Sequence, residues 1–146
     1  MDDEARIPIE SGADLVPARA RGRAAAIRLG FSQTDATLIA TAISEIARNI
    51  VVHAGRGEIT IAPLHEEDRK GLLVVAEDRG PGMAELDGDI EGQSARGGLG
   101  LGLPGARRLM DEFEVASDPN RGTTVTMRKW TTRTALERLG DRRSPP

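Results

Sequence analysis

The stretch that organises the chain is Asp78–Gly105, DRGPGMAELDGDIEGQSARGGLGLGLPG, which holds nine of the seventeen glycines. Glycine loses more backbone entropy on folding than any other residue, so helices and strands avoid such density. An apolar run at 72–76 precedes the stretch and predicts a buried strand, and 106–110 after it predicts a helix. A strand, an acid, a glycine loop and a helix in this order indicate a phosphate-bearing ligand on backbone N–H groups. A long flexible surface loop explains the glycines alone equally well.

Length and composition fit a single domain, which we expect to span residues 1–131, followed by a short charged tail at 132–146. Hydrophobic residues make up 38% of the chain and aromatic residues 2%, so the core must be built from Leu, Ile, Val and Ala. The formal net charge of -3 and the lack of an aromatic stacking platform argue against a nucleic-acid partner. No run approaches the ~18 apolar residues of a membrane span.

The chain contains no cysteine, which excludes disulfides and thiolate metal sites. Its first residues, MDDEARIPIESGAD, are acidic and lack the apolar run of a secretory signal. We therefore expect a cytoplasmic protein with no membrane partner.

The chain before the glycine stretch predicts a strand, two helices and a hairpin. Alternation at 6–10 predicts the strand, and Asp14 is placed to cap the first helix. Ser32 starts the second helix, whose isoleucines are spaced by four, three and four residues and form one apolar stripe. Two apolar runs, 57–64 and 71–77, flank a charged turn and predict the hairpin.

The chain after the glycine stretch predicts a helix at 101–112 and a second strand pair, 113–117 with 123–130. The full order is β-α-α-β-β-loop-α-β-β, so helices and strands are grouped and do not strictly alternate. This grouping predicts an α+β two-layer sandwich with one mixed sheet and the helices on a single face.

Glu45 and Asn49 lie one turn apart on the second predicted helix, at the border of its apolar stripe. Two polar side chains stacked at the edge of a core are placed to face a cleft. A lone Glu-x-x-x-Asn is more often an ordinary solvated helix edge, so the pair gains meaning only together with other motifs.

Four motifs, in this order and spacing, resemble the GHKL ATPase superfamily, which includes gyrase, Hsp90, histidine-kinase catalytic domains and MutL. Glu45 and Asn49 match its N box, and Asp78, Gly80 and Gly82 match its first glycine box. The second glycine box is matched by Gly98, Leu99, Gly100, Leu101 and Gly102, and the threonine motif by Gly122, Thr123 and Thr124. The resemblance runs from the second helix to the last strand and implies the ATP-binding (Bergerat) fold of the superfamily.

The resemblance implies how the chain would bind ATP. The carboxylate of Asp78 would accept a hydrogen bond from the adenine N6 amine, and Thr123 or Thr124 would support the same edge through water. The glycines of the second box would let backbone N–H groups approach the phosphates. Arg96 either reaches the γ-phosphate or is a solvated loop residue.

The N box would supply the metal ligand and the base for phosphoryl transfer. Asn49 matches the family ligand of Mg²⁺, and an amide oxygen suits this cation. Glu45 is a candidate general base for a Ser or Thr hydroxyl of a substrate protein. The alternative is that Glu45 pairs with Arg48 or orients water.

Within the superfamily the chain resembles the small bacterial switch kinases of partner-switching pathways, including that of the stressosome. This implies a serine/threonine kinase, dependent on ATP and Mg²⁺, that phosphorylates STAS-domain proteins and activates a PP2C-type phosphatase by binding. One alternative is an anti-sigma factor that keeps serine kinase activity and sequesters a sigma factor. Another is a non-catalytic, ATP-dependent binding module, which would bind nucleotide without transferring phosphate.

Overall fold

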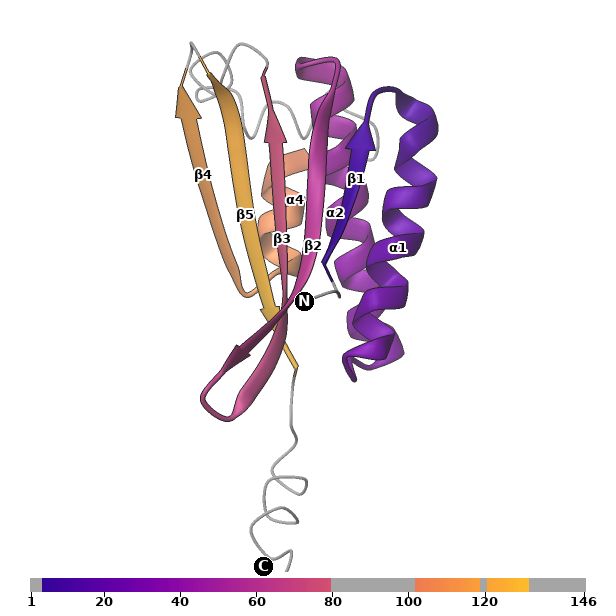
Figure 1. Ribbon diagram of the computed structural model, residues 1–146, viewed down its shortest axis with the longest axis vertical. Helices are drawn as coiled ribbons and strands as arrows, with labels where there is room; N and C mark the ends of the chain where they lie inside the picture. The colour runs from indigo at the N-terminus through magenta and orange to yellow at the C-terminus, as the bar shows by residue number, and fades with distance from the viewer. Residues whose placement is uncertain (1–3, 80–101, 119–120, 132–146) are drawn as a thin grey trace, which may run out of the picture.

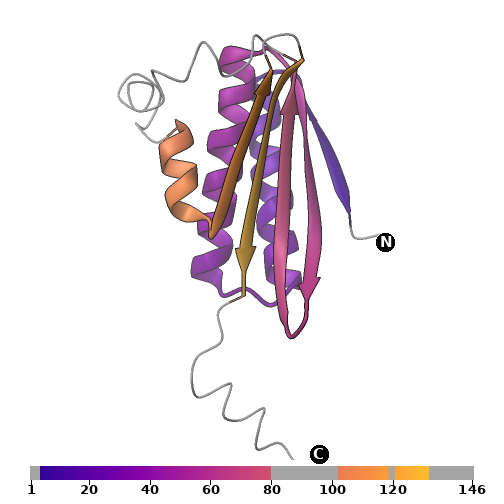
Figure 2. The same cartoon turned by 90° about the vertical axis from the view of Figure 1, so that its left-hand side faces the viewer.

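The computed structural model describes residues 4–79, 102–118 and 121–131 of the chain. Its elements in chain order, with η1 a short 3₁₀ helix, are β1 (Ala5–Ile9), η1 (Gly12–Asp14), α1 (Leu15–Arg28), α2 (Gln33–His53), β2 (Gly57–Glu66), β3 (Arg69–Asp78), α4 (Gly102–Leu109), β4 (Glu112–Asp118) and β5 (Gly122–Trp130). The strands form one layer, and these helices cover one of its faces, as Figure 1 and Figure 2 show. The predicted α+β sandwich is therefore confirmed. None of the helices in these ranges is both long and apolar enough to cross a lipid bilayer.

The strands of the described residues form one five-stranded sheet in the order β1-β2-β3-β5-β4. Each neighbouring pair is antiparallel, so the predicted mixed sheet is wrong in this detail. The connectivity gives the reason. The crossover through α4 carries the chain from β3 to β4, which run in the same direction, but β5 turns back from β4 and inserts between them. Hairpin neighbours are necessarily antiparallel.

Helix α2 is the central element of the helical layer. The hydroxyl of Ser32 accepts a hydrogen bond from the backbone N–H of Asp35 at 3.0 Å and caps the first turn, as predicted. The isoleucines of the predicted stripe are all buried, namely Ile39, Ile43, Ile46 and Ile50. They form one core cluster with the buried side chains of the sheet, and this core consists largely of Ile, Ala, Val and Leu. Its composition agrees with the prediction from the scarcity of aromatic residues.

The start of the first helix differs from the prediction. Ser11, not Asp14, is the residue whose side chain caps a helix, and the helix that it caps is η1. The carboxylate of Asp14 turns back and accepts hydrogen bonds from the backbone N–H groups of Glu10 and Ser11, at 2.7 and 3.1 Å. This reciprocal capping box fixes the short connection from β1 to α1.

The hairpin of β2 and β3 is longer than the apolar runs predicted. Its register pairs Glu66 with Arg69, so most of the charged residues expected in the turn belong to the strands. Glu67, in the remaining two-residue turn, has a φ of 50°, and such tight hairpin turns require positive φ. Pro63 lies beyond Ile61, where the pairing of β2 with β1 ends, so its missing N–H falls at a sheet edge.

Hydrogen bonds fix the C-terminal end of α4 to the far end of β5. The ammonium of Lys129 donates to the carbonyl oxygen of Leu109, the last residue of α4, at 3.0 Å. The backbone N–H of Trp130 donates to the Asp111 carboxylate at 2.8 Å, and its indole N–H donates to Glu112 at 3.0 Å. Because this end of α4 is anchored, its N-terminus is held toward the opposite end of the sheet (Figure 2).

Candidate functional site

One end of the molecule collects the predicted site residues that the structure describes. Strand β3 ends at Asp78, whose register partners are Gly57 at the start of β2 and Thr123 near the start of β5. Helix α2 ends at His53, just before β2 begins, so its C-terminal half lies at this end too (Figure 1). Helix α4 begins nearer to this end of the molecule and runs away from it toward the start of β4 (Figure 2).

Asp78 and Thr123 are direct cross-strand partners, so their side chains lie on the same face of the sheet. The face is the one covered by helices, because the next pair on it, Ala76 and Val125, is buried in the core. Thr123 is only 6% exposed, whereas Thr124 lies on the opposite face. The register therefore favours Thr123 as the partner of Asp78, a choice that the sequence left open.

Glu45 and Asn49 lie one turn apart on the C-terminal half of α2. Glu45 is 7% exposed, and in the described part of the chain it and Thr123 are the only buried polar or charged side chains. Asn49 is half-buried and lies one turn closer to the end of the helix. Glu45 is therefore not a solvated helix edge. Burial of a carboxylate costs free energy unless other groups interact with it, and Glu45 has such an interaction.

Two glycines allow the neighbouring strands to approach Asp78 closely. A Cβ atom at Gly57 would overlap the main-chain oxygen of Glu77 and lie 3.1 Å from the Cα of Asp78. A Cβ atom at Gly122 would overlap the main-chain oxygen of Asp78 and lie 2.7 Å from the Cα of Arg79. Gly122 also has a φ of 106°, which side chains disfavour. Gly122 directly precedes the predicted strand at 123–130, and no sequence pattern singles out Gly57 as a packing partner of Asp78.

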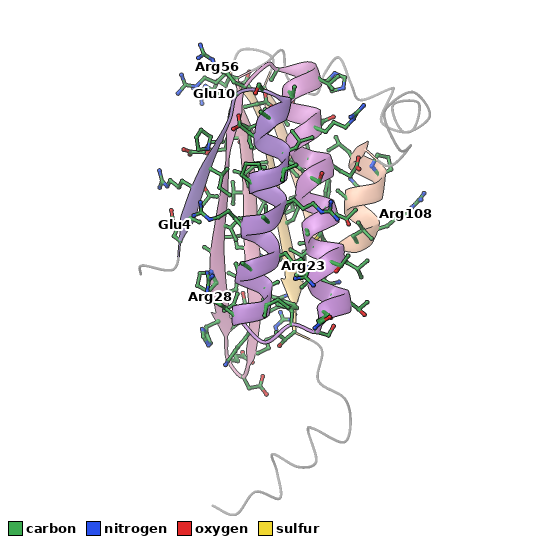
Figure 3. The ribbon with its side chains drawn as sticks, turned by 90° about the vertical axis from the view of Figure 1, so that its right-hand side faces the viewer. Glu4, Glu10, Arg23, Arg28, Arg56 and Arg108 are labelled. Carbon is green, nitrogen blue, oxygen red and sulfur yellow. The ribbon has the colours of Figure 1, made fainter. Side chains whose placement is uncertain are left out.

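A hollow of about 760 Å³ is lined by Asp78, Glu10 and Arg56. Figure 3 shows Glu10 and Arg56 near each other at one end of the molecule. Glu58, Glu77 and Thr124 also line the hollow. Their side chains lie on the face of the sheet that the helices leave uncovered, because successive side chains of a strand point to opposite faces. Ala54, the residue after α2, lines the hollow together with Asp78, so the hollow lies at the end of the sheet and reaches the candidate site. The register places the side chains of Asp78 and Thr123 on the helix-covered face.

Several of the predicted ATP-binding residues lie outside the described residues, namely Gly80, Gly82, Arg96, Gly98, Leu99, Gly100 and Leu101. Gly102 is the first residue of α4, and a helix N-terminus presents backbone N–H groups that bind phosphate. The donor chemistry also fits Mg²⁺. The amide oxygen of half-buried Asn49 is a hard ligand, and this cation commonly completes its shell with phosphates and water.

The chain matches the family model of the histidine kinase-like ATPase domain over residues 10–129. This range contains all the predicted site residues, from Glu45 to Thr124. The chain therefore belongs to the histidine kinase-like ATPase domain family, the class of protein that its motifs predicted.

Curated relatives place the similarity within one branch of this family. The chain is 46% identical to the serine/threonine-protein kinase RsbT of Bacillus subtilis (strain 168) over 131 residues, which cover 89% of this chain and 98% of that protein. It is 33% identical to the serine-protein kinase RsbW of Bacillus pumilus (strain SAFR-032) over 129 residues, 77% of this chain and 75% of that protein. It is 30% identical to an anti-sigma F factor of Clostridium kluyveri (strain NBRC 12016) over 111 residues, 67% of this chain and 76% of that protein. The predicted resemblance to bacterial switch kinases is confirmed.

Proposed function

We propose that the chain is a serine/threonine kinase of a partner-switching pathway that uses ATP and Mg²⁺. Similarity to RsbT over nearly the whole of both chains supports this class of activity. The observation that carries the proposal is the register that sets Asp78 and the buried Thr123 side by side on the helix-covered face, at the end of the molecule where α2 carries Glu45 and Asn49. A carboxylate acceptor with a neighbouring hydroxyl fits the edge of adenine, which presents its N6 amine as a donor.

The proposed adenine contacts come from two neighbouring strands. The carboxylate of Asp78 accepts a hydrogen bond from the N6 amine of adenine, and the hydroxyl of Thr123 supports the same edge through water. Guanine presents an acceptor oxygen where adenine presents this amine, so a carboxylate here selects adenine. The glycines that flank Asp78, Gly57 and Gly122, keep β2 and β5 close and thereby hold its backbone in place.

The proposed phosphoryl transfer uses the N box. Asn49 would hold Mg²⁺ together with the phosphates, and the bound cation would neutralise charge on the transferring group. Glu45 accepts the proton of a substrate Ser or Thr hydroxyl. The new bond forms between this oxygen and the γ-phosphorus, the bond to the bridging oxygen breaks, and ADP leaves. The N-terminus of α4 at Gly102, with the glycines before it, donates backbone N–H groups to the phosphates.

The proposal extends to the proteins that the chain phosphorylates and binds. We propose STAS-domain proteins as the substrates and a PP2C-type phosphatase as the protein that is activated by binding, all in the cytoplasm. The 46% identity to RsbT supports the kinase part of this assignment, and the resemblance of the motifs to the switch kinases of partner-switching pathways suggests the partners.

The test is transfer of labelled γ-phosphate from ATP to a purified STAS-domain protein of the same organism, with Mg²⁺ present. We expect transfer by the natural chain and its loss in Asn49→Ala and Asp78→Asn. Nucleotide binding is measured in parallel by calorimetry. If the natural chain binds ATP and the STAS-domain protein but transfers no phosphate, the chain is a non-catalytic binding module and the proposal is wrong.

An anti-sigma factor is the second candidate function. The identities of 33% to RsbW and 30% to an anti-sigma F factor favour it, although both matches cover less of the chain than the match to RsbT. Co-purification with the sigma factors of the same organism separates the two functions. Stable capture of one sigma factor by the purified chain would replace the first proposal, whereas capture of a PP2C-type phosphatase would support it.

A further inference from the structure

The helices carry an unbalanced set of basic side chains. Four arginines lie on α1, one on α2 and two on α4, and all of them are exposed, namely Arg19, Arg21, Arg23, Arg28, Arg48, Arg107 and Arg108. We call these residues the helix arginines. The acidic residues of the same three helices are Asp35 and Glu45, and Glu45 is buried. Figure 3 shows Arg23 and Arg108 projecting from the helical side. This side is therefore basic although the chain carries a net charge of -3.

Basic residues of the sheet layer form ion pairs, whereas the helix arginines form none with the described residues. Three ion pairs of the sheet layer have nitrogen–oxygen distances of 3.0, 3.2 and 3.4 Å, namely Arg6–Glu4, Arg69–Glu66 and Arg128–Glu112. No ion pair between described residues involves a helix arginine. Like charges gathered on one side of a fold repel one another and lower its stability. Arg28, Arg107 and Arg108 lie in the last turns of their helices, where positive charge is stabilising, and the guanidinium of Arg107 lies 5.1 Å from the centre of the Phe113 ring. Between described residues, no ion pair or ring contact of this kind involves the exposed Arg19, Arg21, Arg23 and Arg48.

A stripe of three exposed apolar residues and Arg23 lies on the outer side of α1. Val16, Ala20, Arg23 and Ile27 follow one another at spacings of four, three and four residues, so they line up along the helix. Val16 is 74% exposed and Ile27 is 41% exposed. The core side of α1 is made by other residues, namely Ala18, Gly22, Ala25 and Ala26. The stripe therefore faces away from the core, and Ala20 allows a close approach at its centre.

We propose that this stripe and the helix arginines beside it form a docking surface for an acidic amphipathic helix of a partner protein. A helical partner would lay its apolar face along Val16, Ala20 and Ile27. Its flanking carboxylates would meet guanidinium groups such as Arg19 and Arg23, which bind carboxylates in paired hydrogen bonds. Helix α1 contributes no residue to the candidate nucleotide site, so this surface stands independently of the proposed phosphoryl transfer.

The observations favour a protein over two other anionic partners. Nucleic acid is bound mainly through its phosphates, which gives no use to an exposed valine and isoleucine within the basic surface. Membrane-binding helices present bulky side chains such as Trp, Phe and Leu to the lipid, and the stripe holds none of these. Arginine is instead enriched at protein interfaces, and the buried centre of such an interface is apolar, which gives a use to the exposed valine and isoleucine.

The test titrates the ¹⁵N-labelled full chain with a synthetic helical peptide that has an Ala and Leu stripe flanked by Glu. Amide shifts in the ¹H–¹⁵N spectrum, at about 0.15 M salt, should map to the outer side of α1. A matched peptide with Gln in place of Glu should bind at least about tenfold more weakly, a difference of about 1.4 kcal/mol. The double variant R19E/R23E should lose the same factor. Arg6→Glu, an exposed substitution on the sheet, should bind as the natural chain does.

Three results would overturn the inference. One is an absence of shifts on α1, or shifts that gather on the sheet. Another is equal binding of the Glu and Gln peptides, which would show that charge has no part in docking. The third is stronger displacement of the α1 signals by duplex DNA or by anionic phospholipid vesicles than by the peptide. The ATP affinity of R19E/R23E should equal that of the natural chain. ATP titrations of this variant therefore distinguish a failure of the docking surface from a failure of the proposed kinase activity.

Discussion

Gly122→Ala should damage ATP binding through the backbone, without removing any group that touches the nucleotide. Gly122 adopts a φ of 106°, and a Cβ atom there would overlap the main-chain oxygen of Asp78. The substitution therefore combines backbone strain with a clash against the end of β3. Either β5 or β3 must move, and Asp78 moves with respect to Thr123.

The chain offers a matched set that separates strain from clash. Gly30 has a φ of 97° with nothing within 4 Å of an added Cβ, so Gly30→Ala adds strain alone, about 1–2 kcal/mol. Gly57→Ala adds a clash alone, against the backbone of Glu77 and Asp78, which by the cost of overpacking is about 1–3 kcal/mol. Gly122→Ala adds both, so its cost should be about 2–5 kcal/mol.

Thermal unfolding measures the loss of stability in each variant, and calorimetry measures the loss of ATP affinity. For a domain of this size each kcal/mol lowers the Tm by roughly 2–4 °C, so Gly122→Ala should have the lowest Tm of the three variants. ATP affinity should stay within about twofold for Gly30→Ala, and should fall at least about tenfold for Gly57→Ala and Gly122→Ala, or about 1.4 kcal/mol. ATP is added well below the Tm of each variant, so that unfolding does not enter the affinity.

The reasoning would be refuted by either of two patterns. If Gly57→Ala and Gly122→Ala lose stability but keep the ATP affinity of the natural chain, the position of Asp78 does not control nucleotide binding. If Gly30→Ala weakens ATP binding as much as Gly122→Ala does, the loss follows from general destabilisation. In that case the local approach of β2 and β5 to Asp78 has no special role.

Three further predictions address single residues. Asp78→Asn should weaken ATP binding by about 1.5–3 kcal/mol in calorimetry, since a hydrogen bond to a charged acceptor is lost and a donor faces the adenine amine; unchanged affinity would remove Asp78 from the adenine site. Glu45→Ala should keep ATP affinity while γ-phosphate transfer to the STAS-domain protein falls by about 10²–10⁴-fold, as for a missing general base; natural rates in this variant would leave Glu45 a structural role only. Ser32→Ala should lower the free energy of unfolding in urea by about 1 kcal/mol, because the hydrogen bond to the Asp35 N–H is lost, with Thr37→Ala on the exposed side of α2 as the control; equal stability of the two variants would contradict the cap.

The sequence was informative where one local pattern settles the structure. The isoleucine stripe of α2 is buried throughout, and Ser32 caps the helix, because both follow from helical periodicity and from the first turn alone. The details of the sheet that were predicted wrongly depend on pairing between strands, which local sequence does not show. The charged residues near Glu67 belong to strands because β2 and β3 pair along their whole length, which overrides local turn preference. The sheet lacks parallel neighbours because β5 inserts between β3 and β4, and no local pattern encodes that insertion.

The sequence by itself determined the family and the α+β class, because the order of the motifs from Glu45 to Thr124 can be read along the chain, and it proposed the residues of the candidate site. Tertiary structure decided which of these residues meet. Strand register places Thr123, and not Thr124, opposite Asp78 on the helix-covered face, since a shift of one residue would exchange the two faces. Packing buried Glu45 and brought Gly57 and Gly122 against the end of β3. Such contacts join residues far apart in sequence, and only the folded chain brings them together.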